Sequence, residues 1–153
     1  MKNILFVCLG NICRSPAAEA IFAQKILNDH EGLVAKIESA GTIGHHQGEP
    51  CDPRMEKALN GRGYESQSLS RRVKDQDFFD FDLILAMDQQ NYEDLMSRRP
   101  DDARASVELM CEFCSERPDR EVPDPYYGGA KGFDLVIDIL EDATEGLIRK
   151  LQS

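Results

Sequence analysis

The stretch Val7-Cys8-Leu9-Gly10-Asn11-Ile12-Cys13-Arg14-Ser15-Pro16 decides how the N-terminal part of the chain folds. The apolar residues 4–7 are typical of a buried strand, whereas residues 17–22 are typical of a helix. Ser15 suits a helix N-cap, and Pro16 suits the first helical position. We therefore expect a short loop that connects the end of a strand to the start of a helix.

A loop of this kind favours the binding of an anion. Unpaired backbone N–H groups and the positive end of the helix dipole point toward the same place. Gly10 and Asn11 adopt most easily the left-handed conformations that turn loop amides inward. The sequence therefore predicts a phosphate-binding loop, and not one of the Walker type, because the Gly-Lys-Ser/Thr ending is absent.

Cys8 and Arg14 suggest the chemistry of this loop. A helix N-terminus and nearby cations lower the pKa of a thiol from about 8.5 to about 3.5–7.5, so we expect Cys8 to be a thiolate and a nucleophile. Arg14 carries a planar fork of donors that matches two phosphate oxygens, and Ser15 could donate a hydrogen bond to the sulfur. Together these side chains predict phosphoryl transfer through a cysteinyl-phosphate. The alternative is a buried cysteine beside an unrelated surface arginine.

A second segment, near the C-terminus, strengthens this interpretation. Residues 8–16 together with Asp124-Pro125-Tyr126-Tyr127-Gly128 resemble the low-molecular-weight protein tyrosine phosphatases. Residues 39–42, 52–53 and 86–88 also resemble the family, in the expected order. The resemblance extends over essentially the whole chain. It implies an enzyme without metal or cofactor that hydrolyses the phosphotyrosine of proteins, or small aryl phosphates.

The resemblance also implies roles for single residues. Asp124 would be the general acid for the leaving phenolate and then the general base for the water that cleaves the phosphocysteine. Cys13 would form a reversible disulfide with oxidised Cys8, unless it is only a small packed residue. Tyr126 and Tyr127 would form one wall of a slot for the substrate ring, or pack the loop. The residues expected to bind the substrate are Leu9, Gly10, Asn11, Ile12, Cys13, Ser15, His45, Tyr126 and Tyr127.

Two positions depart from the family pattern. Many members have an aromatic residue at the rim of the pocket where His45 and His46 stand. The resemblance therefore does not predict the selectivity for the substrate ring. Many members also have a histidine, bonded to the loop asparagine, where Ser68 falls. Asn11 needs another partner here, and Ser68 or Ser70 could substitute.

Alternating patterns along the chain predict an α/β fold. Strands are expected over residues 2–8, 36–40, 83–87 and 107–110. Helices are expected over residues 16–28, 53–60, 76–79 and 133–151, with a further helix that Asp88 caps. This order predicts a four-stranded parallel sheet with helices on both faces, Rossmann-like or flavodoxin-like. Because ligands bind at the carboxyl ends of such strands, Asp124 is expected to stand beside Cys8.

Composition limits the partners and the location. A chain of 153 residues is most simply one domain, here residues 1–153. The formal net charge of −10 argues against nucleic acid and against an anionic membrane surface, so a bound phosphate must be held by local donors. No stretch is long enough to span a bilayer. Five cysteines do not make a disulfide framework, so we expect a reducing cytoplasm.

Cys111 and Cys114 keep other functions open. Their C-x-x-C spacing suggests zinc or a redox pair, but zinc needs four ligands and no second pair exists, so core packing is the plainer interpretation. An arsenate reductase on the same fold would need additional redox cysteines. A phosphoryl carrier of the sugar phosphotransferase type should lack Arg14 and Asp124 in these roles. A silent phosphotyrosine-binding module would not need Cys8.

Overall fold

The computed structural model describes residues 1–126 and 128–153, and its centre is a parallel sheet. The strands of this sheet are β1 (Lys2–Cys8), β2 (Val34–Gly41), β3 (Leu83–Ala86) and β4 (Ser106–Leu109). Their spatial order is β2-β1-β3-β4, and every neighbouring pair is parallel. The predicted four-stranded parallel sheet is confirmed.

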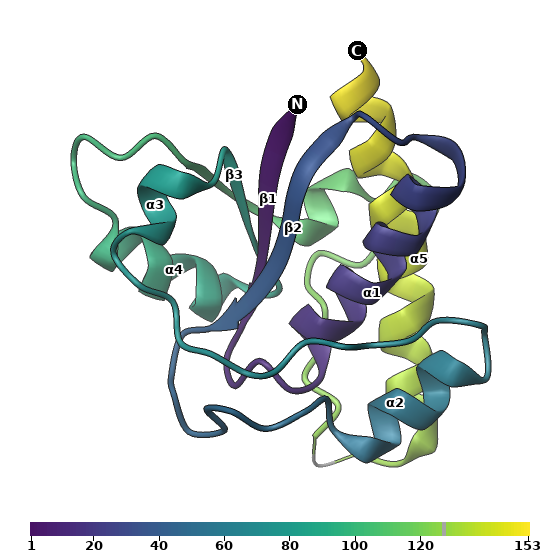
Figure 1. Ribbon diagram of the computed structural model, residues 1–153. Coiled ribbons are helices and arrows are strands. Elements are labelled where there is room, and N and C mark those ends of the chain that lie inside the picture. Colours follow the sequence, from purple (N-terminus) through teal and green to yellow (C-terminus); the bar gives the residue numbers. More distant parts are fainter. Residues whose placement is uncertain (127) are drawn as a thin grey trace.

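Helices cover both faces of this sheet (Figure 1). On one side lie α1 (Arg14–Asp29), α2 (Pro53–Asn60) and the long α5 (Ala130–Gln152). On the other side lie α3 (Asp77–Asp80) and α4 (Gln89–Arg98), and the short 3-10 helix η1 (Met110–Phe113) follows β4. None of the helices in the described ranges is long and apolar enough to cross a membrane.

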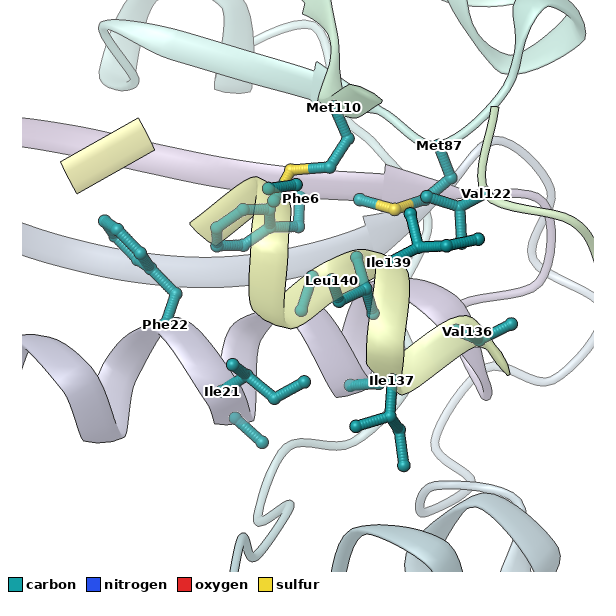
Figure 2. Close-up of a cluster of buried hydrophobic side chains, with 14 of the residues drawn as sticks. Phe6, Ile21, Phe22, Met87, Met110, Val122, Val136, Ile137, Ile139 and Leu140 are labelled. Atoms are coloured by element: carbon teal, nitrogen blue, oxygen red, sulfur yellow. The ribbon is translucent and has the colours of Figure 1, made fainter. Parts of the chain in front are cut away.

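Buried side chains alternate along β1 and supply both faces of the sheet. Phe6 belongs to the core beneath α1 and α5, where its ring meets that of Phe22 nearly edge-on at 5.5 Å between centroids (Figure 2). Leu140 of α5 lies in the same cluster. Leu5, the next residue along β1, belongs to the opposite core with Phe78. Because burying one such side chain contributes about 1.5–3 kcal/mol, the two cores fix the position of β1 and of the loop that follows it.

The predicted start of α1 is wrong. The sequence pattern places Ser15 at the N-cap, but the helix begins at Arg14, and Cys13 occupies the cap position without a side-chain cap bond. Ser15 lies in the first turn, with its Oγ 3.0 Å from Cys8 Sγ. The hydroxyl is therefore turned toward the loop instead of capping the helix.

Other boundaries shift by one to three residues. β2 is longer than predicted at both ends because it pairs with β1 from Lys2↔Val34 to Cys8↔Gly41. β4 and β3 end one residue early, and α5 begins one turn early at Ala130. The predicted caps are confirmed, since Asp52 accepts a hydrogen bond from the amide of Arg54 at 2.8 Å and Asp88 caps α4.

The strands place their carboxyl ends at one edge of the sheet. The chain beyond η1 returns to this edge, where the amide of Val122 donates a hydrogen bond to the carbonyl of Met87 at 2.8 Å. This contact brings the segment that contains Asp124 toward the loop that follows β1.

Candidate active site

The loop between β1 and α1 brings a backbone amide to the sulfur of Cys8. Asn11 has a φ of 58°, in the left-handed region, and its amide donates to Cys8 Sγ at 3.3 Å. The left-handed conformation expected for Gly10 is wrong, because Asn11 is the residue of this loop that has a positive φ. A Cβ at Gly10 would lie 3.0 Å from Cδ2 of His46, so a larger residue there would require the imidazole ring to shift.

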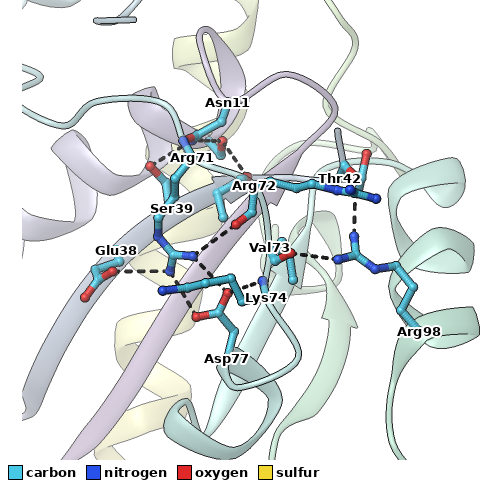
Figure 3. A network of polar contacts seen from close by, with 12 residues as sticks. Asn11, Glu38, Ser39, Thr42, Arg71, Arg72, Val73, Lys74, Asp77 and Arg98 are labelled. Atoms are coloured by element: carbon cyan, nitrogen blue, oxygen red, sulfur yellow. Dashed lines mark hydrogen bonds and ion pairs between the residues drawn. The ribbon is translucent and has the colours of Figure 1, made fainter. Parts of the chain in front are cut away.

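A buried hydrogen-bond network holds Asn11 in this conformation (Figure 3). Its Nδ2 donates to Ser15 Oγ at 2.8 Å and to Ser39 Oγ at 3.0 Å. Its Oδ1 accepts from the amide of Arg71 at 3.0 Å. Ser15 Oγ in turn lies 3.0 Å from Cys8 Sγ. The conformation of the loop and the environment of the sulfur therefore depend on the same side chain.

The prediction that Ser68 or Ser70 supports Asn11 is wrong. Within residues 1–126 and 128–153, no hydrogen bond joins either serine to Asn11; Ser70 Oγ donates instead to the carbonyl of Gly10 at 2.9 Å. Ser39 and the backbone of Arg71 take this role. The Arg71 side chain is itself fixed by Asp77 at 2.9 Å and by Glu38 at 3.2 Å (Figure 3).

Arg14 is almost completely buried, with 2% of its surface exposed. Its Nη1 donates to Asp88 Oδ2 at 2.6 Å and to the carbonyl of Val122 at 3.1 Å, whereas Nη2 lies 3.6 Å from Asp124 Oδ2. Burial lowers the pKa of Arg14, but Cys8 and the carboxylates of Asp88 and Asp124 outweigh it, so the pKa lies above its ordinary value. Asp88 thus orients Arg14 in addition to capping α4. From the sequence, Asp88 could act near Arg14, but the cap alone was enough to explain it.

Burial affects two other cysteines near the loop. It raises the pKa of Cys13, with the Asp52 carboxylate adding to the effect. It also raises the pKa of Cys51, to about 12. Both side chains are therefore thiols at neutral pH.

The loop forms the floor of a cavity of about 210 Å³ that opens at the carboxyl edge of the sheet. The structure brings most of the predicted site residues together there. The cavity is lined by Cys8, Leu9, Gly10, Ile12, Cys13, Arg14, Ile43, His45, His46, Asp124 and Tyr126. Asn11 and Ser15 are not among the lining residues and act on the site through hydrogen bonds. Tyr127 lies outside the described residues.

Ile43 is a lining residue that sequence reasoning missed, whereas His46 lines the cavity as its predicted place at the rim implies. Both lie in the segment after β2, where no periodic pattern indicates which side chains face the cavity. The sequence does hold a signal for Ile43, because it is a large apolar residue in a mostly polar loop. In the structure Ile43 is 41% exposed. His46 Nδ1 lies 2.6 Å from Glu49 Oε2, and its ring centroid lies 6.1 Å from that of Tyr126.

Tyr126 forms one wall of the cavity beside Asp124. The amide of Tyr126 donates to Asp124 Oδ1 at 3.1 Å, which leaves Oδ2 directed at Arg14. The guanidinium carbon of Arg54 lies 5.1 Å from the centre of the Tyr126 ring and 4.9 Å from that of Phe133. Tyr126 is thus supported by a cation that also contacts the ring of Phe133.

Cys111 and Cys114 do not line this cavity. Cys111 is buried in η1, and Cys114 Sγ lies 3.9 Å from the carbonyl of Ile139 on α5. The hydrogen bond between the two thiols raises the pKa of Cys111 and lowers that of Cys114. Among the described residues, no group of three or more His, Cys, Asp or Glu side chains is placed to hold a metal ion.

Comparison with known proteins agrees with this geometry. The family model of low molecular weight phosphotyrosine protein phosphatases matches residues 3–153. A putative low molecular weight protein-tyrosine-phosphatase of Synechocystis is 50% identical, over 97% of this chain and 96% of that protein. A low molecular weight phosphotyrosine protein phosphatase of Schizosaccharomyces pombe is 40% identical, over 98% of each chain.

Solved structures give the same result. A protein tyrosine phosphatase from Entamoeba histolytica has a TM-score of 0.94 at 50% identity, covering 99% of this chain and 97% of that one. Primo-1 has a TM-score of 0.94 at 31% identity, covering 100% of both chains. The chain belongs to the low-molecular-weight phosphotyrosine protein phosphatases, enzymes that hydrolyse phosphotyrosine.

Proposed function

We propose that Cys8 is the nucleophile of this phosphatase and attacks the phosphorus of the substrate in line. One observation carries the proposal: the amide of Asn11 and the hydroxyl of Ser15 converge on Cys8 Sγ at 3.3 and 3.0 Å, at the floor of the cavity that Arg14 and Asp124 also line. Donors on a thiolate stabilise its charge and make the sulfur a better leaving group in the second step.

Arg14 and the amides of residues 9–14 stabilise the phosphoryl group during transfer. The contacts of Nη1 with Asp88 and Val122 hold the guanidinium on one side, so that Nη2 points toward the cavity. A fixed planar fork matches two equatorial oxygens of a phosphate, and its orientation is set before the substrate arrives. Charge on the transferring phosphoryl group is therefore met by donors that need no reorganisation.

Asp124 protonates the tyrosine oxygen as its bond to phosphorus breaks. The covalent product is phosphocysteine on Cys8, and the leaving group departs as a neutral phenol. Asp124, now a carboxylate, takes a proton from water as the water oxygen attacks phosphorus. This step releases inorganic phosphate and restores the thiolate.

The substrates are tyrosine-phosphorylated proteins or small aryl phosphates, held by the loop and by a rim that includes His45 and Tyr126. We propose that residues 1–153 work as one domain without metal or cofactor. The net charge of −10 disfavours nucleic acid and anionic membranes as partners. The five free cysteines support a cytoplasmic location.

Asp124→Asn tests the general acid, because it keeps the shape of the side chain and removes the proton. A phenolate as basic as tyrosine, with a pKa of about 10, leaves poorly without protonation, whereas nitrophenolate needs little help. A positioned acid contributes ~10²–10⁴ in rate, so kcat/KM should fall far more for phenyl phosphate than for nitrophenyl phosphate. Asp119→Asn, in the same segment but paired with Arg117, is the matched control. An equal drop for both substrates would leave Asp124 with only a structural role.

Cys8→Ser tests the nucleophile. We expect the variant to lose turnover while it still binds vanadate, whereas Cys114→Ser should keep turnover. Substantial hydrolysis by Cys8→Ser would falsify the assignment. The same samples should be assayed for arsenate reduction with thioredoxin, because reduction that requires Cys111 or Cys114 would favour the reductase instead.

A further inference from the structure

A second cavity, of about 610 Å³, lies between α2 and the beginning of α5. Arg54, Lys57 and Arg62 line it from α2 and the turn that follows. Gly129 and Phe133 line it from the start of α5. We call it the Lys57 cavity. It is distinct from the cavity above Cys8, since none of the described residues lines both.

The two cavities nevertheless share a wall. Arg54 lines the Lys57 cavity, and its guanidinium stacks on the ring of Tyr126, which lines the cavity above Cys8. Its other ring neighbour, Phe133, lines the Lys57 cavity. Only the contact of Arg54 with Tyr126 needs to be crossed between the two cavities, and each residue of an extended chain spans about 3.3–3.6 Å. Residues close in sequence to a phosphotyrosine above Cys8 are therefore the ones to consider for the Lys57 cavity.

The lining of the Lys57 cavity carries more cationic than acidic side chains. Three of its lining residues are cationic and one, Asp134, is acidic, although the net charge of the protein is −10. Two of these cations already have partners. Arg62 pairs with Asp138 at 2.7 Å, Glu141 at 2.8 Å and Asp134 at 3.9 Å. Arg54 pairs with Asp52 at 3.0 Å.

Lys57 is different from its two neighbours. In the part of the chain that the structure describes, its ammonium group has no ion pair and no hydrogen bond. α5 begins beside it without a side-chain cap and without an acidic residue in its first turn. The unshared positive charge of Lys57 and the amides of this turn both favour an anionic group.

We propose that the Lys57 cavity binds the carboxylate of an acidic residue close in sequence to the phosphotyrosine of a substrate protein. Lys57 is then a residue that determines specificity, and the phosphate above Cys8 and the carboxylate beside Lys57 are bound together. This inference rests on the proposed function, because it names the class of phosphotyrosine protein that the same site prefers.

The experiment compares kcat/KM for pairs of phosphotyrosine peptides that carry Glu or Gln at one position, scanned over four residues on each side. For the unmodified protein at low ionic strength, we expect Glu to be preferred at one or more positions by about three- to fivefold, as for a partly exposed ion pair. In Lys57→Gln the ratio should fall to about one. Lys57→Glu should invert it, so that a Lys-containing peptide is preferred at the same position.

Lys150→Gln is the matched control, because it removes the same charge near the other end of α5. Lys150 lies about 30 Å along the helix from Ala130, at 1.5 Å per residue. The control variant should keep the preference of the unmodified protein. Nitrophenyl phosphate has no flanking residues, so its turnover should be equal in all variants. A ratio that Lys57→Gln leaves unchanged, or the absence of a Glu preference at every position, would overturn the inference. Failure of the unmodified protein to hydrolyse nitrophenyl phosphate would instead contradict the proposed function.

Discussion

Asn11 holds the loop after β1 through its side-chain hydrogen bonds and through its left-handed backbone conformation, and two substitutions separate these contributions. Asn11 is 2% exposed, lies in the left-handed region at φ 58°, and makes three side-chain hydrogen bonds. Asn11→Ala and Asn11→Gly both remove these bonds. Only glycine, however, tolerates the left-handed backbone without a steric penalty.

The expected losses of unfolding free energy follow from these contacts. At about 1 kcal/mol for each hydrogen bond, both variants should lose ~3 kcal/mol. In Asn11→Ala, the strain of the left-handed conformation increases this loss by about 1–2 kcal/mol. In Asn11→Gly, the greater entropy of the unfolded chain increases the loss by about 0.4–1 kcal/mol. Asn11→Gly should therefore be more stable than Asn11→Ala by roughly 1 kcal/mol, or about 2–4 °C in Tm for a chain of this length.

Urea unfolding and kcat/KM for nitrophenyl phosphate are the measurements. Because the amide of Asn11 reaches Cys8 Sγ only in this backbone conformation, Asn11→Ala should also be the less active variant. Ala23→Gly, in the interior of α1, is the control, and there glycine should be the less stable residue by about 1 kcal/mol.

Two results would refute this reasoning. If Asn11→Ala is as stable as Asn11→Gly, the left-handed conformation is not what the backbone of this loop requires. If both variants keep full stability, the contacts of Asn11 with Ser39 and Arg71 do not hold the loop, and its position must depend on other contacts.

Three further predictions concern metal, oxidation and packing. Full activity should survive a strong chelator, and a loss that zinc or magnesium restores would contradict the proposed mechanism. Mild peroxide should give a Cys8–Cys13 disulfide that thiols reverse, which peptide mapping would show; a bond from Cys8 to another cysteine would exclude this pairing. Gly146→Ala should lower Tm strongly, because its Cβ would meet the carbonyl of Phe113, whereas Gly132→Ala on the same helix should leave Tm unchanged or slightly higher.

The elements that could be predicted from the sequence are those fixed by near neighbours. The caps at Asp52 and Asp88 are local, since each carboxylate binds an amide two or three residues away. The strand before Cys8 is evident because its apolar residues are buried on both faces of a parallel sheet. Both kinds of signal act within a few residues and need no knowledge of the fold.

The errors occur where tertiary contacts replace local ones. Ser15 has a sequence typical of a cap, but its hydroxyl is turned to Cys8 and Asn11. Asn11 in turn finds its partners 28 and 60 residues away, at Ser39 and Arg71. No pattern in one sequence indicates which distant polar group forms a hydrogen bond with a buried side chain such as Asn11, because the partner depends on how the strands and loops pack.

The sequence by itself contains the residues on which the proposed chemistry of the loop after β1 depends. The residue types for a nucleophile, a phosphate clamp and a left-handed turn lie within seven positions, from Cys8 to Arg14. Only the tertiary structure decided which distant residues contact this loop. Parallel strands bring their carboxyl ends to one edge, so Asp88 and Asp124, 74 and 110 residues beyond Arg14, meet its guanidinium at 2.6 and 3.6 Å. The packing of α2 against the start of α5 likewise created the Lys57 cavity, because neither segment forms a cavity alone.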